Sequence, residues 1–130
     1  MRNNWLIFLT ACVLFGSSLS EAHGIKDGLG KKTLPDGSVY EGQFKDGAFE
    51  GRGTLTYANG QQYTGEFKNG LYDGQGVLIY TDGSKYEGQF KKGLLNGQGV
   101  LTYSDATQYK GQFKDGNFND AVLVNSSYVE

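Results

Sequence analysis

Four stretches of the sequence decide the fold: Tyr40-Glu41-Gly42-Gln43-Phe44, Tyr63-Thr64-Gly65-Glu66-Phe67, Tyr86-Glu87-Gly88-Gln89-Phe90 and Tyr109-Lys110-Gly111-Gln112-Phe113. Each stretch begins 23 residues after the previous one. The same spacing relates further glycine, leucine and tyrosine residues, namely Gly47, Gly70, Gly93 and Gly116; Gly51, Gly74 and Gly97; Gly53, Gly76 and Gly99; Leu55, Leu78 and Leu101; and Tyr57, Tyr80 and Tyr103. This many matches at one spacing indicate a tandem array whose units stack on their neighbours.

Within a unit the apolar residues alternate with polar ones, which is the pattern of a β-strand with one buried face. Tyr40, Gly42 and Phe44 share one face of the first strand, and Gly51 to Tyr57 alternate in the same way in a second strand. The sequence therefore predicts an all-β fold. We expect an elongated, single-layer antiparallel sheet, a meander of tandem 23-residue β-hairpins. About nine short strands should lie between Gly28 and Ser126, with no helix after the N-terminal segment.

Glycines recur at the expected connections between strands, where positive φ costs a residue with a Cβ roughly 1–2 kcal/mol. A two-residue loop at Asn59-Gly60 would place Tyr57 and Tyr63 on opposite faces, so we expect a three-residue loop with a glycine bulge, which keeps both tyrosines on one face. Asp105-Ala106 lacks the glycine and predicts a looser or differently shaped turn.

Glycines also occur inside the expected strands, where they are weak strand formers and need a reason. An aromatic ring lying over the glycine would replace the missing packing. We expect this arrangement at Gly42, Gly65, Gly88 and Gly111.

The pattern Tyr-x-Gly-x-Phe, Gly-x-Gly-x-Leu-x-Tyr and Asp/Asn-Gly resembles the membrane occupation and recognition nexus (MORN) repeat over residues 28 to about 126. The resemblance implies a twisted antiparallel sheet with a role in protein binding, scaffolding or membrane association. In this interpretation a MORN-repeat domain spans 23–130, with a half repeat at 28–37 and full repeats from 38, 61, 84 and 107. Asp120 and Val122 replace glycines, so about 120–130 is interpreted as a C-terminal cap.

The N-terminal 22 residues have the order of a signal peptide: Arg2, an apolar run from Trp5 to Phe15, then small residues. Cleavage after Ser20 or after Ala22 fits equally well. The sequence thus predicts export to the periplasm or the exterior. Two alternatives stay open: an uncleaved anchor, and lipid attachment at Cys12, because Leu9-Thr10-Ala11-Cys12 resembles the lipobox of lipid-anchored envelope proteins.

Composition argues against several classes of function. The 12 Lys and Arg against 14 Asp and Glu give a net charge of −2, which offers no general attraction for nucleic acid. The single histidine, His23, lies at the cleavage region, and the single cysteine is Cys12. Catalysis needs a positioned acid, base, nucleophile or metal. We therefore expect no enzyme activity, no catalytic residues, no metal site and no cofactor.

Two sets of residues are candidates for binding. The first is an aromatic set, whose alternative explanation is packing of the array on itself: Tyr40, Phe44, Tyr63, Phe67, Tyr86, Phe90, Tyr109 and Phe113. The second is a lysine column for contact with an anionic surface, whose alternative explanation is a solvated face: Lys45, Lys68, Lys91 and Lys114. We favour the aromatic set, because Glu41, Glu66 and Glu87 lie close enough in the sequence to offset the lysine charges.

These sets predict a non-catalytic, exported protein-interaction or scaffolding module whose protein partner the sequence does not name. The alternative is a peripheral membrane or envelope-polymer binding protein that contacts anionic lipid and is anchored in the cell envelope if Cys12 is lipidated. A homo-oligomer is compatible with either function.

The predicted export can be tested on the native protein. N-terminal sequencing is expected to begin at Glu21 or at His23, because the small residues before each of these positions fit a signal peptidase. A cytoplasmic protein that retains Met1 would contradict export. A blocked N-terminus at Cys12 would instead support the lipid anchor.

Overall fold

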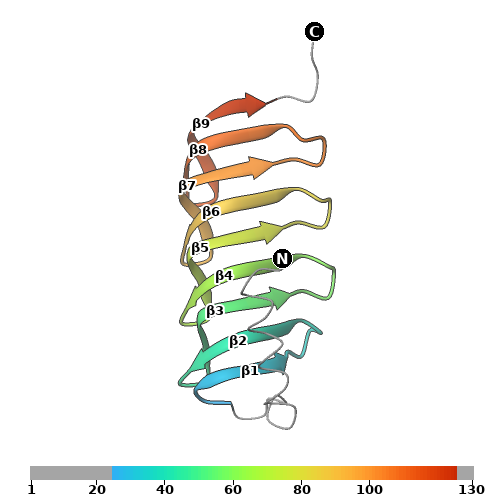
Figure 1. The fold of residues 1–130 in the computed structure, drawn as a ribbon, viewed down its shortest axis with the longest axis vertical. Coiled ribbons are helices and arrows are strands. Elements are labelled where there is room, and N and C mark those ends of the chain that lie inside the picture. The colour runs from blue at the N-terminus through green and yellow to red at the C-terminus, as the bar shows by residue number, and fades with distance from the viewer. Residues whose placement is uncertain (1–24, 126–130) are drawn as a thin grey trace, which may run out of the picture.

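The computed structural model describes residues 25–125, which form one open sheet (Figure 1). Its strands are β1 (Gly28–Thr33), β2 (Val39–Lys45), β3 (Ala48–Thr56), β4 (Gln62–Lys68), β5 (Leu71–Ile79), β6 (Lys85–Lys91), β7 (Leu94–Thr102), β8 (Gln108–Lys114) and β9 (Asn117–Asn125). Each strand pairs antiparallel with the next, so the order in the sheet is the order in the chain. The predicted all-β meander is confirmed for this part of the chain.

The predictions for the first 24 residues, including the signal peptide, its cleavage and Cys12, lie outside the described residues. In residues 25–125 there is no helix long and apolar enough to cross a membrane.

Three-residue loops connect the strands at one edge of the sheet, which we call the loop edge. At the loop from Tyr57 to Gln61, the Tyr57 N–H donates to the Gln61 carbonyl at 2.8 Å and the Gly60 N–H donates to the Tyr57 carbonyl at 2.9 Å. Gly60 has φ of +96°. Leu55 faces Tyr63 across the strands, so Tyr57 and Tyr63 lie on one face. The predicted glycine-bulge loop is therefore confirmed.

The expectation of a looser turn at Asp105-Ala106 is wrong. The Ala106 N–H donates to the Tyr103 carbonyl at 2.8 Å, and the Tyr103 N–H donates to the Thr107 carbonyl at 2.8 Å, as in the glycine loops. Ala106 itself takes φ of +76°. The flanking strand pairs and the Asp105 carboxylate, which accepts the Thr107 N–H at 2.9 Å, hold alanine in a conformation that it disfavours.

Two-residue turns connect the strands at the opposite edge, the turn edge. In each turn both residues have positive φ, as Asn69 (+50°) and Gly70 (+84°) do, which is the type I′ geometry of tight hairpins. The Gly70 N–H donates to the Phe49 carbonyl at 3.0 Å, and the Asn69 N–H donates to the Glu50 carboxylate at 3.0 Å. Asp27 and Asp73 accept equivalent bonds from Asp46 and Lys92. Each turn is thus docked on the preceding hairpin.

Close to the turn edge, a bulge interrupts the pairing within each hairpin. Gly42 faces Gly53 and Phe44 faces Phe49, so three residues of β3 stand against one residue of β2. Gly51, inside the bulge, has φ of +78°. The side chain of Gln43 fills the gap and accepts the Arg52 N–H at 2.8 Å. Because a bulge bends its strand, the strands curve near this edge (Figure 1).

The last hairpin departs from this register. Gly111 faces Ala121, whereas the 23-residue spacing would place it opposite Val122. In the three preceding hairpins the bulge contains a glycine with positive φ, and Asp120 stands at that position of the repeat. The shift agrees with the sequence-based expectation that the end of the array differs from its middle.

The core lies on one face of the sheet, which we call the inner face, and its central contact joins a tyrosine to paired glycines. The Tyr40 hydroxyl donates to the Gln43 carbonyl at 2.7 Å, and a Cβ on Gly53 would lie 2.5 Å from a ring carbon of Tyr40. Equivalent tyrosines cover Gly76 and Gly99. The ring-over-glycine prediction is confirmed and extends to the second glycine of each described pair.

These glycines form a continuous row of direct cross-strand neighbours from β1 to β8: Gly30, Gly42, Gly53, Gly65, Gly76, Gly88, Gly99 and Gly111. The row leaves a channel along the sheet that the tyrosine rings occupy.

We expect Gly88→Val to destabilise the protein by about 1–3 kcal/mol, because a Cβ there would lie 2.5 Å from the Gln98 carbonyl oxygen and 2.5 Å from the Gly99 Cα. Glu87→Val is the matched control, since it adds the same side chain one residue away at an exposed position. Thermal unfolding monitored by circular dichroism measures both variants. Equal melting temperatures for Gly88→Val and the wild type would refute the steric account.

We expect Ala106→Gly to stabilise the protein by about 0.5–1 kcal/mol, because glycine relieves the cost of positive φ at the expense of some unfolded-state entropy. The reverse change, Gly83→Ala, lies in the equivalent loop one unit earlier, where an added Cβ would meet only the Ser104 Cβ at 3.8 Å. It should destabilise by a similar amount. Urea unfolding of both variants gives the comparison, and a loss of stability in Ala106→Gly would contradict the account.

Candidate binding surface

The aromatic residues predicted to bind a partner form the core instead. Tyr40, Tyr63 and Tyr86 have no exposed surface, and the phenylalanines of the set are at most 4% exposed. Only Tyr109 is half-buried. A partner cannot reach the buried rings on the folded sheet, so their proposed role as an accessible contact surface is corrected to one of self-packing.

The rings pack in a regular pattern that explains their burial. Phe49 stacks on Tyr40 with ring centroids 3.8 Å apart and an angle of 7° between the planes, while Phe44 meets Tyr40 edge-on at 5.1 Å. Phe67, from the next unit, meets the same Tyr40 edge-on at 5.1 Å. Each tyrosine is therefore enclosed by rings from its own hairpin and the next. Burial raises the pKa of Tyr40 and raises that of Tyr86 to about 12, so both phenols are neutral at physiological pH.

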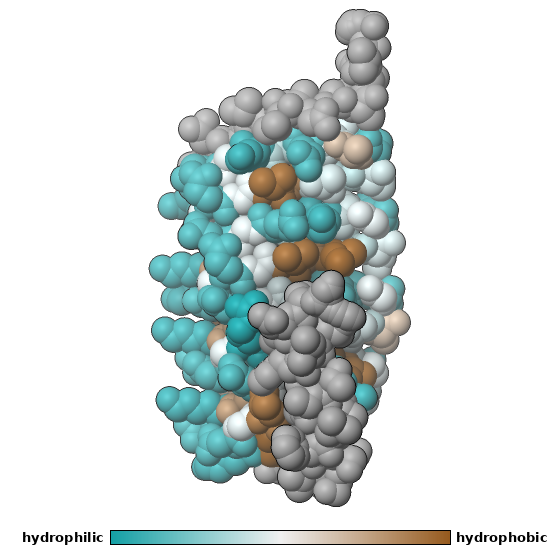
Figure 2. All heavy atoms as spheres, in the orientation of Figure 1, coloured by the Kyte–Doolittle hydropathy of each residue, from teal (hydrophilic) through white to brown (hydrophobic). Residues whose placement is uncertain are grey.

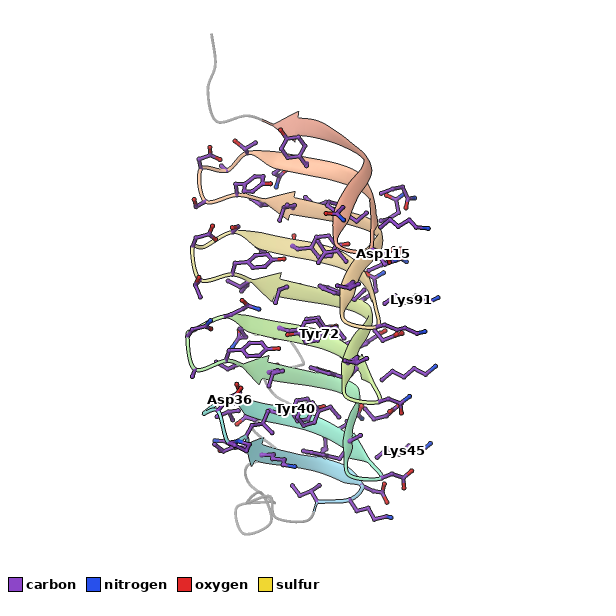
Figure 3. The ribbon with its side chains drawn as sticks, turned by 180° about the vertical axis from the view of Figure 1, so that it is seen from behind. Asp36, Tyr40, Lys45, Tyr72, Lys91 and Asp115 are labelled. Carbon is purple, nitrogen blue, oxygen red and sulfur yellow. The ribbon has the colours of Figure 1, made fainter. Side chains whose placement is uncertain are left out.

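A second row of apolar side chains lies on the inner face and reaches the surface, and we call it the inner-face band. Its members are half-buried, except Tyr103, which is 38% exposed. They are Tyr57, Tyr72, Tyr80, Leu95, Leu101 and Tyr103. The band extends over three hairpins and rests directly on the core (Figure 3).

The side chains of the band are held in place by the core beneath them. Tyr72 stacks on Tyr63 with centroids 3.8 Å apart, and its hydroxyl is 2.5 Å from that of Tyr57. Burial, followed by the hydrogen bond with Tyr57, raises the pKa of Tyr72. Sequence reasoning missed Tyr72 and Leu95 as surface residues. The signal that could have found them is the apolar position two residues after each turn glycine, which also contains Phe49.

The lysine column lies at the turn edge, fully on the surface. Lys45, Lys68, Lys91 and Lys114 are exposed. Figure 3 shows Lys45 and Lys91 pointing away from the sheet, and Figure 2 shows hydrophilic side chains gathered along this edge. Among the residues with described side chains, none of these lysines forms an ion pair.

The glutamates expected to offset the lysine charges have other partners. Glu41 pairs with Lys31 at 3.4 Å, Glu66 with Arg52 at 4.0 Å, and Glu87 with Lys85 at 3.5 Å. All of these pairs are partly exposed and contribute little to stability. They do, however, leave the lysine column without a close carboxylate among the pairs of the described residues.

Carboxylates at the loop edge have a local structural role, as their sequence context suggested. Asp36, Asp82 and Asp105 each accept the backbone N–H two residues ahead, at 2.8–2.9 Å. Hydrogen bonds from Ser38, Ser84 and Thr107 lower the pKa of these carboxyl groups, so they are ionised at neutral pH. Within residues 25–125, no three His, Cys, Asp or Glu side chains gather closely enough to hold a metal ion.

Comparison with known proteins supplies one match. The family model described as MORN repeat matches five consecutive segments, at residues 22–39, 40–62, 63–85, 86–108 and 109–119. A search of curated proteins finds no match. The matched segments cover all the strands from β1 to β8 and the start of β9.

Proposed function

The chain belongs to the MORN repeat family, and from this premise we propose that it is a non-catalytic, exported module that binds a protein partner and acts as a scaffold. MORN repeats indicate a repeat protein with an interaction or binding role. The inner-face band is the observation that supports a protein as the ligand. The signal-like order of residues 1–22 supports the exported location.

The chemistry of the band matches that of protein interfaces. Tyrosine is enriched where proteins bind each other, because its ring brings a large apolar area and its hydroxyl brings a directional hydrogen bond. Three tyrosines of the band, Tyr57, Tyr80 and Tyr103, recur once per unit. Two strand spacings separate successive units by about 10 Å. An extended segment of a partner could therefore contact equivalent positions on several units.

The band is also preorganised, which lowers the entropy lost on binding. Tyr72 is fixed by its stack on Tyr63 and its contact with the Tyr57 hydroxyl. Because the sheet extends by adding units, the contact surface is long and narrow, as in other solenoid-like arrays.

A second candidate function is binding to an anionic membrane or envelope polymer, and the lysine column favours it. Each lysine close to an anionic membrane contributes about 1 kcal/mol. The four lysines are exposed at the turn edge. They lie at a different edge from the loops that flank the band, so variants can separate the two functions.

We expect the binding partner to be lost when the band is changed and retained when the lysines are changed. The band variant is Tyr57→Ser with Tyr80→Ser, and the lysine variant replaces Lys45, Lys68, Lys91 and Lys114 by Gln. Affinity capture from the cell envelope, followed by titration with the purified partner, measures the effect. We expect at least a tenfold loss of affinity in the band variant.

Ile79→Ser is the matched control, because Ile79 lies on the neighbouring strand position, is 38% exposed and is not in the band. Circular dichroism and size-exclusion chromatography verify the fold and oligomeric state of each variant. Loss of binding in the lysine variant alone, with salt-sensitive sedimentation on anionic vesicles, would support the second candidate. Retention of the partner by every variant would reject the proposed surface.

A further inference from the structure

The third hairpin of the array lacks a ring that the two preceding hairpins have. Phe49 stacks on Tyr40 and Tyr72 stacks on Tyr63, both with centroids 3.8 Å apart. The equivalent residue of the third hairpin is Leu95, 23 residues after Tyr72. Leu95 packs against the core but is shorter than a tyrosine and brings no hydroxyl.

A hollow of about 400 Å³ lies where the outer part of that ring would be. Its sides are formed by Tyr80 and Tyr103, its apolar lining includes Leu95, Leu101 and Phe113, and Asp82 lies at its rim. This volume is within the range of small-ligand sites. The hollow is therefore an opening within the inner-face band, open to the solvent at the loop edge.

Replacement of the ring also changes the hydrogen bonding of the tyrosine beside it. In the preceding unit the Tyr57 hydroxyl meets that of Tyr72 at 2.5 Å. Tyr80 occupies the position of Tyr57, and among the residues with described side chains its hydroxyl has no hydrogen-bond partner. A ligand in the hollow could take the place of the missing partner.

The charge of the hollow favours a cation. One oxygen of the Asp82 carboxylate accepts the Ser84 N–H at 2.8 Å and the Ser84 hydroxyl, which leaves the other oxygen open to a ligand. These bonds lower the pKa of Asp82, so it is negatively charged at neutral pH. The lining residues include no Lys, Arg or His. Two tyrosine rings add the electron-rich faces that attract cations.

We propose that this hollow binds an arginine side chain of the protein partner; the inference rests on the proposed function and deepens it. The planar guanidinium group can lie against a tyrosine ring while its N–H groups donate to the Asp82 carboxylate and the Tyr80 hydroxyl. Its aliphatic stem can contact Leu95 and Leu101. Lysine fits less well, because its ammonium group is compact and strongly hydrated.

The hollow is tested with a small probe, Nα-acetyl-arginine methylamide, titrated into the isotopically labelled protein and monitored by NMR chemical shifts. The matched control probe is the citrulline analogue, which has almost the same shape but is uncharged. We expect saturable shifts at Tyr80, Asp82 and Tyr103 with a dissociation constant on the order of 1 mM, which corresponds to a single charge-assisted contact. We expect no saturation with the citrulline probe.

Two variants test the site, and the chain itself supplies their designs. Leu95→Tyr restores the residue found at position 72 and should fill the hollow and abolish binding without loss of stability. Asp82→Asn removes the charge but keeps the turn, because Asn59 accepts the equivalent N–H at 2.9 Å in the preceding unit. It should weaken binding at least fivefold. Asp36→Asn, the same change in a loop remote from the hollow, should have no effect.

Equal binding of the two probes, absence of shifts, or retention of binding in the folded Leu95→Tyr variant would overturn the proposal. The result is independent of the partner capture described above. If the arginine probe binds but the band variant retains the partner, the proposed function fails and the hollow remains a cation site. If the band variant loses the partner but the probe does not bind, the arginine inference alone is rejected.

Discussion

The packing of each tyrosine ring over a pair of glycines is the interaction on which the rest of the structure depends. The Tyr63 hydroxyl reaches across Gly65 to the Glu66 carbonyl at 2.7 Å, and its ring lies where a side chain on Gly76 would be. The hydrogen bond satisfies a backbone acceptor beside the bulge, and the ring replaces the packing that two glycines cannot supply. A side chain at either glycine would displace the ring and also disturb the next hairpin, because Phe90 meets Tyr63 edge-on at 5.0 Å.

This constraint separates positions that must repeat from positions that can vary. The glycine row, the tyrosines over it and the docked turns recur because each contact links one unit to the next. Residues at the outer end of the core have no such obligation. The change from Tyr72 to Leu95 therefore leaves Tyr86 fully buried while it opens a hollow at the surface. Local variety in a repetitive array is thus concentrated where a partner could reach it.

The two edges of the sheet have different chemistry. The turn edge carries lysines that have no ion pair among residues with described side chains, whereas the loop edge carries ionised carboxylates next to tyrosines of the inner-face band. A net charge of −2 does not reveal this separation, because opposite charges cancel in the sum. The proposed protein-binding surface and the alternative anionic-surface contact occupy different edges, so the choice between them is a geometric question.

The 23-residue spacing and the alternation of residues were sufficient by themselves to predict the strands, the meander, the loop length at Asn59-Gly60 and the rings over glycines, because these features depend on local geometry and on repetition. The accessibility of each aromatic residue was decided by the tertiary structure. Tyr40 and Tyr57 lie on the same face and are equivalent in the pattern, yet the first is enclosed by rings of two hairpins and the second reaches the surface. The ordered loop at Ala106 and the hollow beside Leu95 were also beyond the pattern, since both result from contacts between strands and rings that are distant in the sequence.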